Sequence, residues 1–226
     1  MTVCAVPALM LLVGLGVWQL QRLEWKEALI AERTASLSRP SVEVSAVPAD
    51  GWQSYDLHRV TLSGRFLHDR TIEIVNRSLK GRPGVHVVTP LALADGRGTV
   101  LVDRGWAPPA RDRRPGEMRY PEGDVTLDGI LRAGGRPNPW FPDNEPENRI
   151  WFYADPSAMA AALGLEDARP YIVEAGPGDV AGASYPVGGQ TVVSIANNHL
   201  QYALTWFGLA GTLIAIYVLY HVRRRK

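Results

Sequence analysis

His199 is the residue of this sequence whose type and position best suit ligand binding, because it lies three residues before a long uncharged apolar stretch. The positive end of a helix dipole at this position disfavours the imidazolium, which leaves a neutral ring nitrogen able to coordinate a metal such as haem iron. Gln201, Tyr202 and Trp206 follow along the next turns and offer an aromatic and amide surface for a flat apolar cofactor. The alternative is a helix-start histidine that hydrogen-bonds to the backbone or to lipid.

Other patterns that carry chemistry are weak or missing. Cys4 is the single cysteine, which excludes a thiolate zinc site, a C-x-x-C redox pair and covalent haem attachment. No G-x-S-x-G, H-E-x-x-H or Walker motif occurs. Asp143, Glu145 and Glu147 alternate in a loop, where carboxylates are usually only solvated. We therefore expect a protein that is not an enzyme, and a membrane-anchored hydrolase using a loop acid is the least favoured function.

The remaining histidines are expected to have structural or surface positions. His58 and His68 lie in or beside a strand with alternating polar residues, so we expect both to face solvent. His86 is interpreted as a half-buried strand residue in preference to a ligand. His221 belongs to a basic C-terminal tail.

Two apolar segments predict membrane spans, one at each end of the chain. Residues 3–20 contain no charged side chain, and residues 202–220 contain nothing more polar than threonine. At ~1.5 Å per residue either segment makes a helix about as long as a bilayer's hydrocarbon layer is thick. A cleaved signal peptide is the alternative for the first segment, but it lacks a basic start and an A-x-A site. We therefore interpret it as an uncleaved anchor.

The end of the first span carries aromatic and polar residues typical of a water boundary. Trp18 and Trp25 are seven positions apart and so share one helix face, where indole rings favour the membrane interface. Gln19, Arg22 and Lys26 follow a neighbouring stripe. This stripe either faces lipid headgroups or contacts a partner.

Small residues in both spans predict that the two helices pack closely. Gly208 with Thr212, and Gly211 with Ala215, have the small-x-x-x-small spacing. The expected partner is the first span, through Ala8, Gly14 and Gly16.

Basic residues indicate the orientation of the spans. Arg223–Lys226 follow the second span, and no charged residue occurs between positions 180 and 222, so the C-terminus is expected in the cytoplasm. Arg22, Lys26 and Arg33 after the first span argue for the opposite topology, which remains open. Without the terminal cluster the chain is slightly acidic, and we expect no nucleic-acid binding.

The middle of the chain predicts a mostly antiparallel β domain, a sandwich or an open barrel. Short β-type runs alternate with Gly, Pro, Asp and Asn, without a β-α-β rhythm. The expected strands cover 57–67, 71–76, 85–93, 99–103, 125–131, 150–153, 171–174 and 191–195. The fold class is therefore α+β, with two transmembrane helices flanking this domain and one short helix within it.

The short helix and the linkers define the expected domain organisation. Asp155 caps a helix from Pro156 to Leu163, which Gly164 ends, and the Pro-rich segments 108–121 and 137–146 are expected to be surface loops. The expected divisions are transmembrane helix 1 (1–20), a helical extension and linker (21–40), the β domain (41–200), transmembrane helix 2 (201–220) and the cytoplasmic tail (221–226).

Five segments in order resemble the Surfeit-locus-1 family over essentially the whole chain. They are LGVWQLQRLEWK (15–26), GVHVVTPL (84–91), VLVDRGW (100–106), NRIWFYAD (148–155) and PVGGQTVVSIANNHLQYALTWFGLA (186–210). The resemblance implies a membrane-anchored assembly factor for haem-copper cytochrome c oxidase that binds haem a transiently or delivers it to the catalytic subunit. It also implies that both termini lie in the cytoplasm or mitochondrial matrix and the β domain in the periplasm or intermembrane space. We expect the protein to be integral to the bacterial inner membrane, with both termini cytoplasmic and the β domain periplasmic.

The resemblance also suggests roles for individual residues. His199 matches the family histidine usually proposed to bind haem, while Trp18, Gln19 and Arg22 are candidates for the haem pocket or a partner contact. Weaker candidates for docking or for contact with haem propionates are Arg104 and Trp106, for which the alternative is a structural cation–π or turn role.

The sequence departs from the family at several places, and one other function stays open. The family often has Asn where Asp103 stands and commonly an aromatic residue where His86 stands. The segment before the first span is shorter and less basic here than the resemblance leads us to expect. The expected partners are the oxidase catalytic subunit, other assembly factors and the lipid bilayer. The alternative function is a scaffold that stabilises oxidase subunits without handling cofactor.

Overall fold

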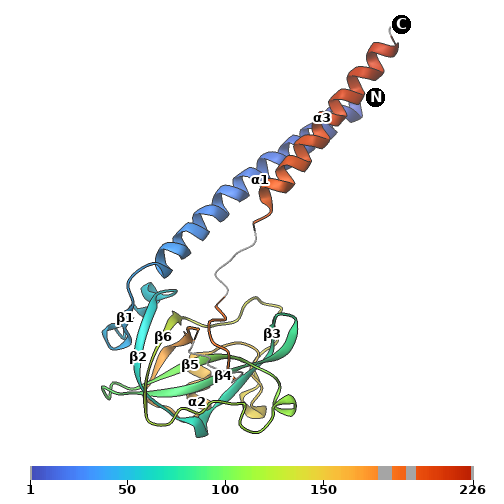
Figure 1. The fold of residues 1–226 in the computed structure, drawn as a ribbon. Helices are drawn as coiled ribbons and strands as arrows, with labels where there is room; N and C mark the ends of the chain where they lie inside the picture. The colour runs from blue at the N-terminus through green and yellow to red at the C-terminus, as the bar shows by residue number, and fades with distance from the viewer. Residues whose placement is uncertain (1, 178–184, 192–196, 225–226) are drawn as a thin grey trace. The chain divides into compact units, whose positions relative to one another are not determined.

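The computed structural model describes residues 2–177, 185–191 and 197–224, which fall into two units. One unit contains residues 1–34 and 192–226, and the other is the β domain of residues 35–191 (Figure 1). Residues 192–195 of the expected last strand, and Arg225 and Lys226 of the basic tail, lie outside the described residues.

The first unit consists of two long helices, α1 (Thr2–Leu37) and α3 (His199–Arg224). Cys4–Leu37 and His199–Arg223 are long and apolar enough to cross a membrane by length and composition. Helix α1 continues well beyond its apolar part because no Gly or Pro interrupts the chain between Leu20 and Pro40. The expected terminal helices are therefore present.

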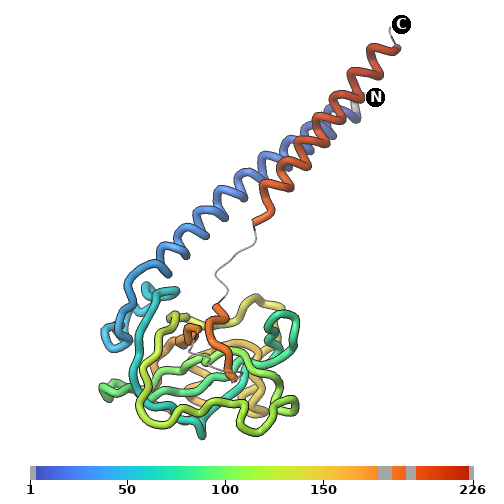
Figure 2. Tube along the Cα trace, viewed as in Figure 1, coloured from blue at the N-terminus to red at the C-terminus, as the bar shows by residue number. Residues whose placement is uncertain are grey.

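The β domain is a barrel in which five strands form a closed ring. Figure 2 shows the path of the chain through this domain. The order around the ring is β2 (Arg59–Phe66), β6 (Asp124–Arg132), β7 (Ala168–Ala175), β5 (Thr99–Ala107) and β4 (Arg82–Leu93). Closure comes from β2, whose residues 64–66 pair with residues 91–93 of β4. All ring pairs are antiparallel except β5 with β7, which confirms the expected mostly antiparallel domain.

Two strands extend the ring at its margins. Strand β3 (Ile72–Leu79) pairs antiparallel with β4, and the two-residue β1 (Val42–Glu43) pairs parallel with β2. Single turns of 3-10 helix connect the elements at η1 (Val44–Ala46), η2 (Trp52–Tyr55), η3 (His68–Arg70), η4 (Ala110–Asp112) and η5 (Pro146–Asn148).

The expected strand at 150–153 is wrong, since the segment makes only isolated bridges. Ile150 pairs with Glu145, and Trp151 pairs with Ile74 of β3. The next backbone N–H groups, of Phe152 and Tyr153, donate to the side-chain oxygen of Asn144 at 2.8 and 3.2 Å. Because a side chain takes these donors, no ladder extends along the segment.

Helix α2 (Pro156–Ala162) follows the sequence expectation closely. The carboxylate of Asp155 accepts a hydrogen bond from the backbone N–H of Ala158 at 3.0 Å, and Gly164 beyond the helix has a φ of +64°. The helix belongs to an apolar cluster with strand residues, whose buried members are Ile74, Val88, Leu101, Trp151, Met159, Ala160, Leu165 and Ile172. This helix therefore covers part of the sheet with an apolar face.

The main core is a second apolar cluster, contributed largely by the ring strands. Its buried strand residues are Val60, Leu62, Phe66, Leu91, Leu93, Val100, Val102, Leu131, Tyr171 and Val173. Alternate positions of β5, Val100 and Val102, belong to this cluster, while Leu101 belongs to the cluster with α2. The strand is therefore covered on both faces, which explains its continuous apolar run.

Tyr171 carries a hydroxyl group that has no hydrogen-bond partner among the described residues although it is buried. Burial raises the pKa of Tyr171. The pKa of Tyr171 is therefore higher in the folded than in the unfolded protein. The contribution of the neutral side chain to the free energy of unfolding is complete below the ordinary tyrosine pKa, and it is lost as the pH rises through the folded-state pKa.

We expect Tyr171→Phe to raise the free energy of unfolding by about 1 kcal/mol at pH 8, because it removes an unpaired buried hydroxyl. The difference from wild type should grow above pH ~10, where only the wild-type unfolded chain ionises at this position. Urea unfolding at both pH values measures this. A variant less stable than wild type at pH 8 would show that the hydroxyl makes a favourable interaction.

Candidate functional site

Helix α3 begins at His199, and the two asparagines before it accept hydrogen bonds from backbone N–H groups of its first turn. The side-chain oxygen of Asn197 accepts a hydrogen bond from the backbone N–H of His199 at 3.4 Å. The backbone oxygen of Asn198 accepts one from the N–H of Tyr202 at 3.2 Å. Asparagine is favoured before a helix because its side chain satisfies free N–H groups there. The sequence thus fixes the histidine in the first turn.

The imidazole of His199 is hydrogen-bonded to α1. Its Nδ1 lies 2.7 Å from Oε1 of Gln19. Gln19 is a buried residue of α1, with only 9% of its surface exposed. A carbonyl oxygen only accepts, so Nδ1 is the donor in this bond, and in the neutral imidazole Nε2 is then the nitrogen with the lone pair. The structure therefore joins a candidate ligand to a residue of the opposite end of the sequence.

One face of α3 contacts α1 around this hydrogen bond. His199, Ala203, Phe207 and Ala210 share that face by helical spacing, and the two alanines are almost fully buried. A side chain added at Gly16 of α1 would lie 2.6 Å from the Phe207 ring, so this glycine permits the close approach.

The expected small-residue contact is wrong for most of its glycines. A side chain added at Gly14, Gly208 or Gly211 would meet nothing within 4 Å. The two α3 glycines point away from the face of Ala203 and Ala210, because each residue turns the helix by about 100°. The α3 side of the contact is formed by His199, Ala203, Phe207 and Ala210, and not by the predicted glycines.

The other α1 candidates lie away from Gln19. Trp18 and Trp25 are 53% and 52% exposed, and the Arg22 guanidinium lies 4.0 Å from the centroid of the Trp25 ring. The sequence placed Gln19 and Arg22 on one stripe, but Gln19 is buried while Arg22 is exposed. An exposed cation–π pair and two indole rings thus form a separate surface of this helix.

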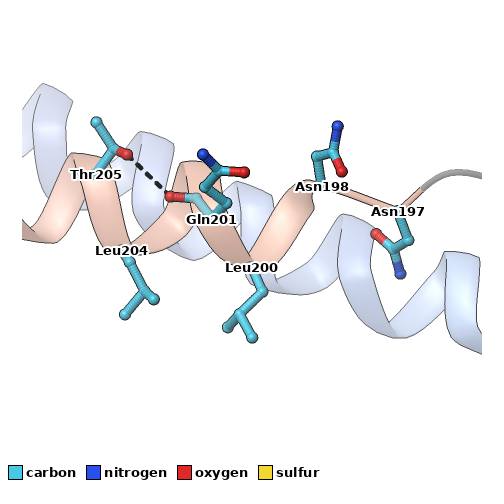
Figure 3. Close-up of a pocket in the computed structure, with 6 residues that line it drawn as sticks. All are labelled: Asn197, Asn198, Leu200, Gln201, Leu204 and Thr205. Carbon is cyan, nitrogen blue, oxygen red and sulfur yellow. Dashed lines mark hydrogen bonds between the residues drawn. The ribbon is translucent and has the colours of Figure 1, made fainter.

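The α3 candidates are divided between two sides of the helix. An open groove of about 560 Å³ is lined by Asn197, Asn198, Leu200, Gln201, Leu204 and Thr205 (Figure 3). His199 does not line it, although the sequence grouped His199 with Gln201. Trp206 is half-buried seven residues after the histidine and shares its helix face, whereas Tyr202 is 55% exposed.

In the β domain, Arg104 lies in a β-bulge. Asp103 pairs with Val88 and Trp106 pairs with His86, so Arg104 and Gly105 both stand opposite one residue of β4. The extra residue changes the alternation of the strand.

The Arg104 side chain itself is buried. Its guanidinium lies 5.0 Å from the centroid of the Phe66 ring and donates through Nη2 to the backbone oxygen of Arg119. Burial lowers the pKa of Arg104 to about 10. Its Nη1 has no partner among the described residues. These contacts make Arg104 part of the packing of the domain.

Trp106 is also part of this packing. The residue is 2% exposed, and its ring meets that of Tyr185 at 5.8 Å in an edge arrangement. Arg82 lies 5.7 Å from the centroid of its ring. The backbone of Trp106 exchanges hydrogen bonds with Val187 at 3.0 and 2.8 Å, so the D-R-G-W and P-V-G-G segments are in contact.

A histidine–carboxylate pair that the sequence did not predict lies on β4 and β5. Nδ1 of His86 is 2.7 Å from Oδ2 of Asp103, whose Oδ1 accepts from the N–H of Gly105 at 2.9 Å. His86 is half-buried in its strand, as expected. Cross-strand register alone could have found the pair, because the bulge places Asp103 next to His86 on one face.

The expectation that His58 faces solvent is wrong. The residue is 7% exposed, and its Nε2 lies 2.7 Å from Nη1 of Arg39. His68 is half-buried, and its Nε2 lies 2.9 Å from the backbone oxygen of Pro121. Both histidines follow turns of 3-10 helix or strand ends, where alternation no longer indicates which face is buried.

The loop acids do not gather into a site. Asp143 pairs with Arg136 at 3.0 Å, and Glu145 accepts from the side chain of Asn148 at 2.9 Å. Within the described parts of the chain, no group of three or more His, Cys, Asp or Glu residues could hold a metal ion. A metal held by the side chains of these residue types in the described parts of the chain would therefore have fewer than three such ligands.

Comparison with known proteins decides the family. The sequence model of the SURF1 family matches residues 6–211. The chain belongs to this family. The match covers His199 and the whole described β domain, which confirms the resemblance carried by the five sequence segments.

Several known proteins are similar to this chain along most of its length. Surfeit locus protein 1 of Mus musculus is 36% identical over 231 residues, covering 93% of this chain and 72% of the relative. The human protein of that name is 35% identical over 220 residues, covering 88% and 70%. A SURF1-like protein of Monosiga brevicollis is 34% identical over 219 residues, covering 91% and 81%.

Proposed function

We propose that this chain is a membrane-anchored assembly factor for haem-copper cytochrome c oxidase that holds haem a on its way to the catalytic subunit. Membership of the SURF1 family supports the role in oxidase assembly, because this is a family of assembly factors and not a known class of enzyme. The single observation that supports the haem role is the hydrogen bond of His199 Nδ1 to Gln19, because Nε2 is then the nitrogen able to coordinate a metal when the ring is neutral.

The residues around His199 fit a haem that is held by one protein ligand. A haem brings an iron with axial coordination positions and a flat apolar macrocycle. His199 would hold the iron through Nε2, and the half-buried Trp206 on the same helix face would contact the ring system. One protein ligand favours reversible binding, which a carrier needs. Tyr202 and Trp18 are exposed and add aromatic surface, whereas Gln201 lies toward the groove of α3.

The proposed location is the bacterial inner membrane, with α1 and α3 as the two spans. The basic residues Arg223–Lys226 support a cytoplasmic C-terminus, and two spans then place both termini there and residues 41–200 in the periplasm. The exposed Arg22 and Trp25 provide a surface for the oxidase catalytic subunit or other assembly factors.

The test is the haem content of the full-length protein purified in detergent from cells that also synthesise haem a. We expect a haem spectrum for wild type and a loss of at least about tenfold in bound haem for His199→Ala, because the axial ligand is removed. His221→Ala is the matched control, since His221 lies in the same helix and hydrogen-bonds to the backbone oxygen of Tyr217. The control should keep its haem.

Two outcomes would contradict the haem role. A wild-type protein that stays colourless yet captures the catalytic subunit would identify a scaffold that handles no cofactor. Deletion of the gene should leave an oxidase poor in haem a, and an oxidase with unchanged haem a and activity would remove the support for any assembly role.

A further inference from the structure

Gln19 is a polar side chain in an otherwise apolar part of α1. Residues 3–20 contain no charged residue and only this amide. The residue is nevertheless 9% exposed, so its amide is withdrawn from the surroundings of the helix pair. Burial of an amide is unfavourable unless it is hydrogen-bonded, and the described partner of its oxygen is the imidazole of His199.

We propose that Gln19 is a positioning residue that fixes the tautomer and the ring orientation of His199. By accepting the hydrogen of Nδ1 at 2.7 Å, its Oε1 holds the ring with Nε2 as the nitrogen able to bind a metal. The positioning role of Gln19 rests on the proposed function only in taking haem as the group that His199 binds. In protein metal sites, a hydrogen bond to the second ring nitrogen commonly orients a histidine ligand and increases its basicity.

Neighbouring polar residues of α1 do not replace Gln19 in this role. Gln21 and Arg22 are exposed, and Arg22 stacks on the Trp25 ring. Gln201 of α3 lines the groove on the other side of that helix. The backbone N–H of His199 is held by Asn197, which orients the main chain but not the ring. Among the described residues, the side chain of Gln19 is thus the one that orients the imidazole across the helix pair.

The first experiment uses the haem-free, full-length protein with 15N-labelled histidine. Two-dimensional NMR of the ring nitrogens should show His199 of wild type in the Nδ1–H tautomer. Gln19→Leu should give a mixture of tautomers, because leucine offers no acceptor. Gln19→Glu should restore the Nδ1–H form, since a carboxylate oxygen also accepts. Gln21→Leu, which changes an exposed glutamine of the same helix, should behave as wild type.

The second experiment measures haem a binding by the same variants. We expect Gln19→Leu to weaken binding by about tenfold, Gln19→Glu to recover it, and Gln21→Leu to leave it unchanged. Circular dichroism establishes that each variant keeps its helices, and the glutamate variant tests the role even where the leucine variant is unstable.

The outcomes separate this inference from the haem role. An Nε2–H tautomer in wild type, or an unchanged tautomer in Gln19→Leu, would overturn the positioning role whether or not haem binds. A tautomer that responds to Gln19 in a protein that never binds haem a would support the positioning role and reject haem as the metal group.

Discussion

Trp151→Ala is expected to lower the free energy of unfolding of the β domain by about 3–5 kcal/mol, the usual cost of removing a fully buried indole. Trp151 is 1% exposed and lies in the apolar cluster that includes Leu101, Ile172 and Met159 of α2. Its backbone oxygen also accepts a hydrogen bond from Val75 at 2.7 Å, which ties its loop to β3. Removal of the ring leaves a cavity between helix and sheet.

Urea unfolding of the full-length protein in detergent, followed by tryptophan fluorescence and far-ultraviolet circular dichroism, measures this effect. Trp140→Ala is the matched control, because Trp140 is 95% exposed and should change the unfolding free energy by less than about 0.5 kcal/mol. Equal effects of the two substitutions would show that the cluster under α2 does not contribute as its burial indicates.

The second large effect is expected for Gly105→Ala, which should destabilise the domain by about 3 kcal/mol or more. Gly105 has a φ of +109°, a conformation that residues with a side chain rarely adopt. An added Cβ would also lie 2.0 Å from the backbone oxygen of Val187. The substitution would therefore force apart β5 and the segment that Trp106 holds by two backbone hydrogen bonds.

Gly96→Ala separates the effect of backbone strain from the effect of the clash with Val187. Gly96 has a φ of +70° but an added Cβ there meets nothing within 4 Å, so only the backbone strain of about 1 kcal/mol applies. Thermal unfolding of both variants provides the comparison. A Gly105→Ala protein no less stable than the Gly96→Ala protein would mean that the contact with Val187 is dispensable.

The sequence predicted the helices and strands of this fold better than it predicted the closure of the strands into a barrel. Periodicity and capping residues identified the terminal helices, helix α2 and six of the seven strands, because these signals are local. It did not distinguish a sandwich from a barrel, since that depends on the pairing of β2 with β4, where Phe66 lies opposite Leu91. It also missed β1, whose two residues are too few for an alternating pattern.

The candidate site was predicted in part. The position of His199 at the start of an apolar helix was visible in the sequence, because helix starts have local signals. Its contact with Gln19 was not, since the two residues are 180 positions apart and their meeting depends on how two helices pack. The pair of His86 and Asp103 was missed for a related reason, as it depends on a bulge that shifts the register of β5.

The hydrogen bond between Gln19 and His199 has a consequence for biosynthesis. Gln19 precedes the β domain in the chain and His199 follows it, 180 positions later. The bond cannot form while the ribosome is still translating the β domain. A nascent or truncated chain that lacks α3 has no ring to orient, so the ligand site is completed only after the intervening domain has been synthesised.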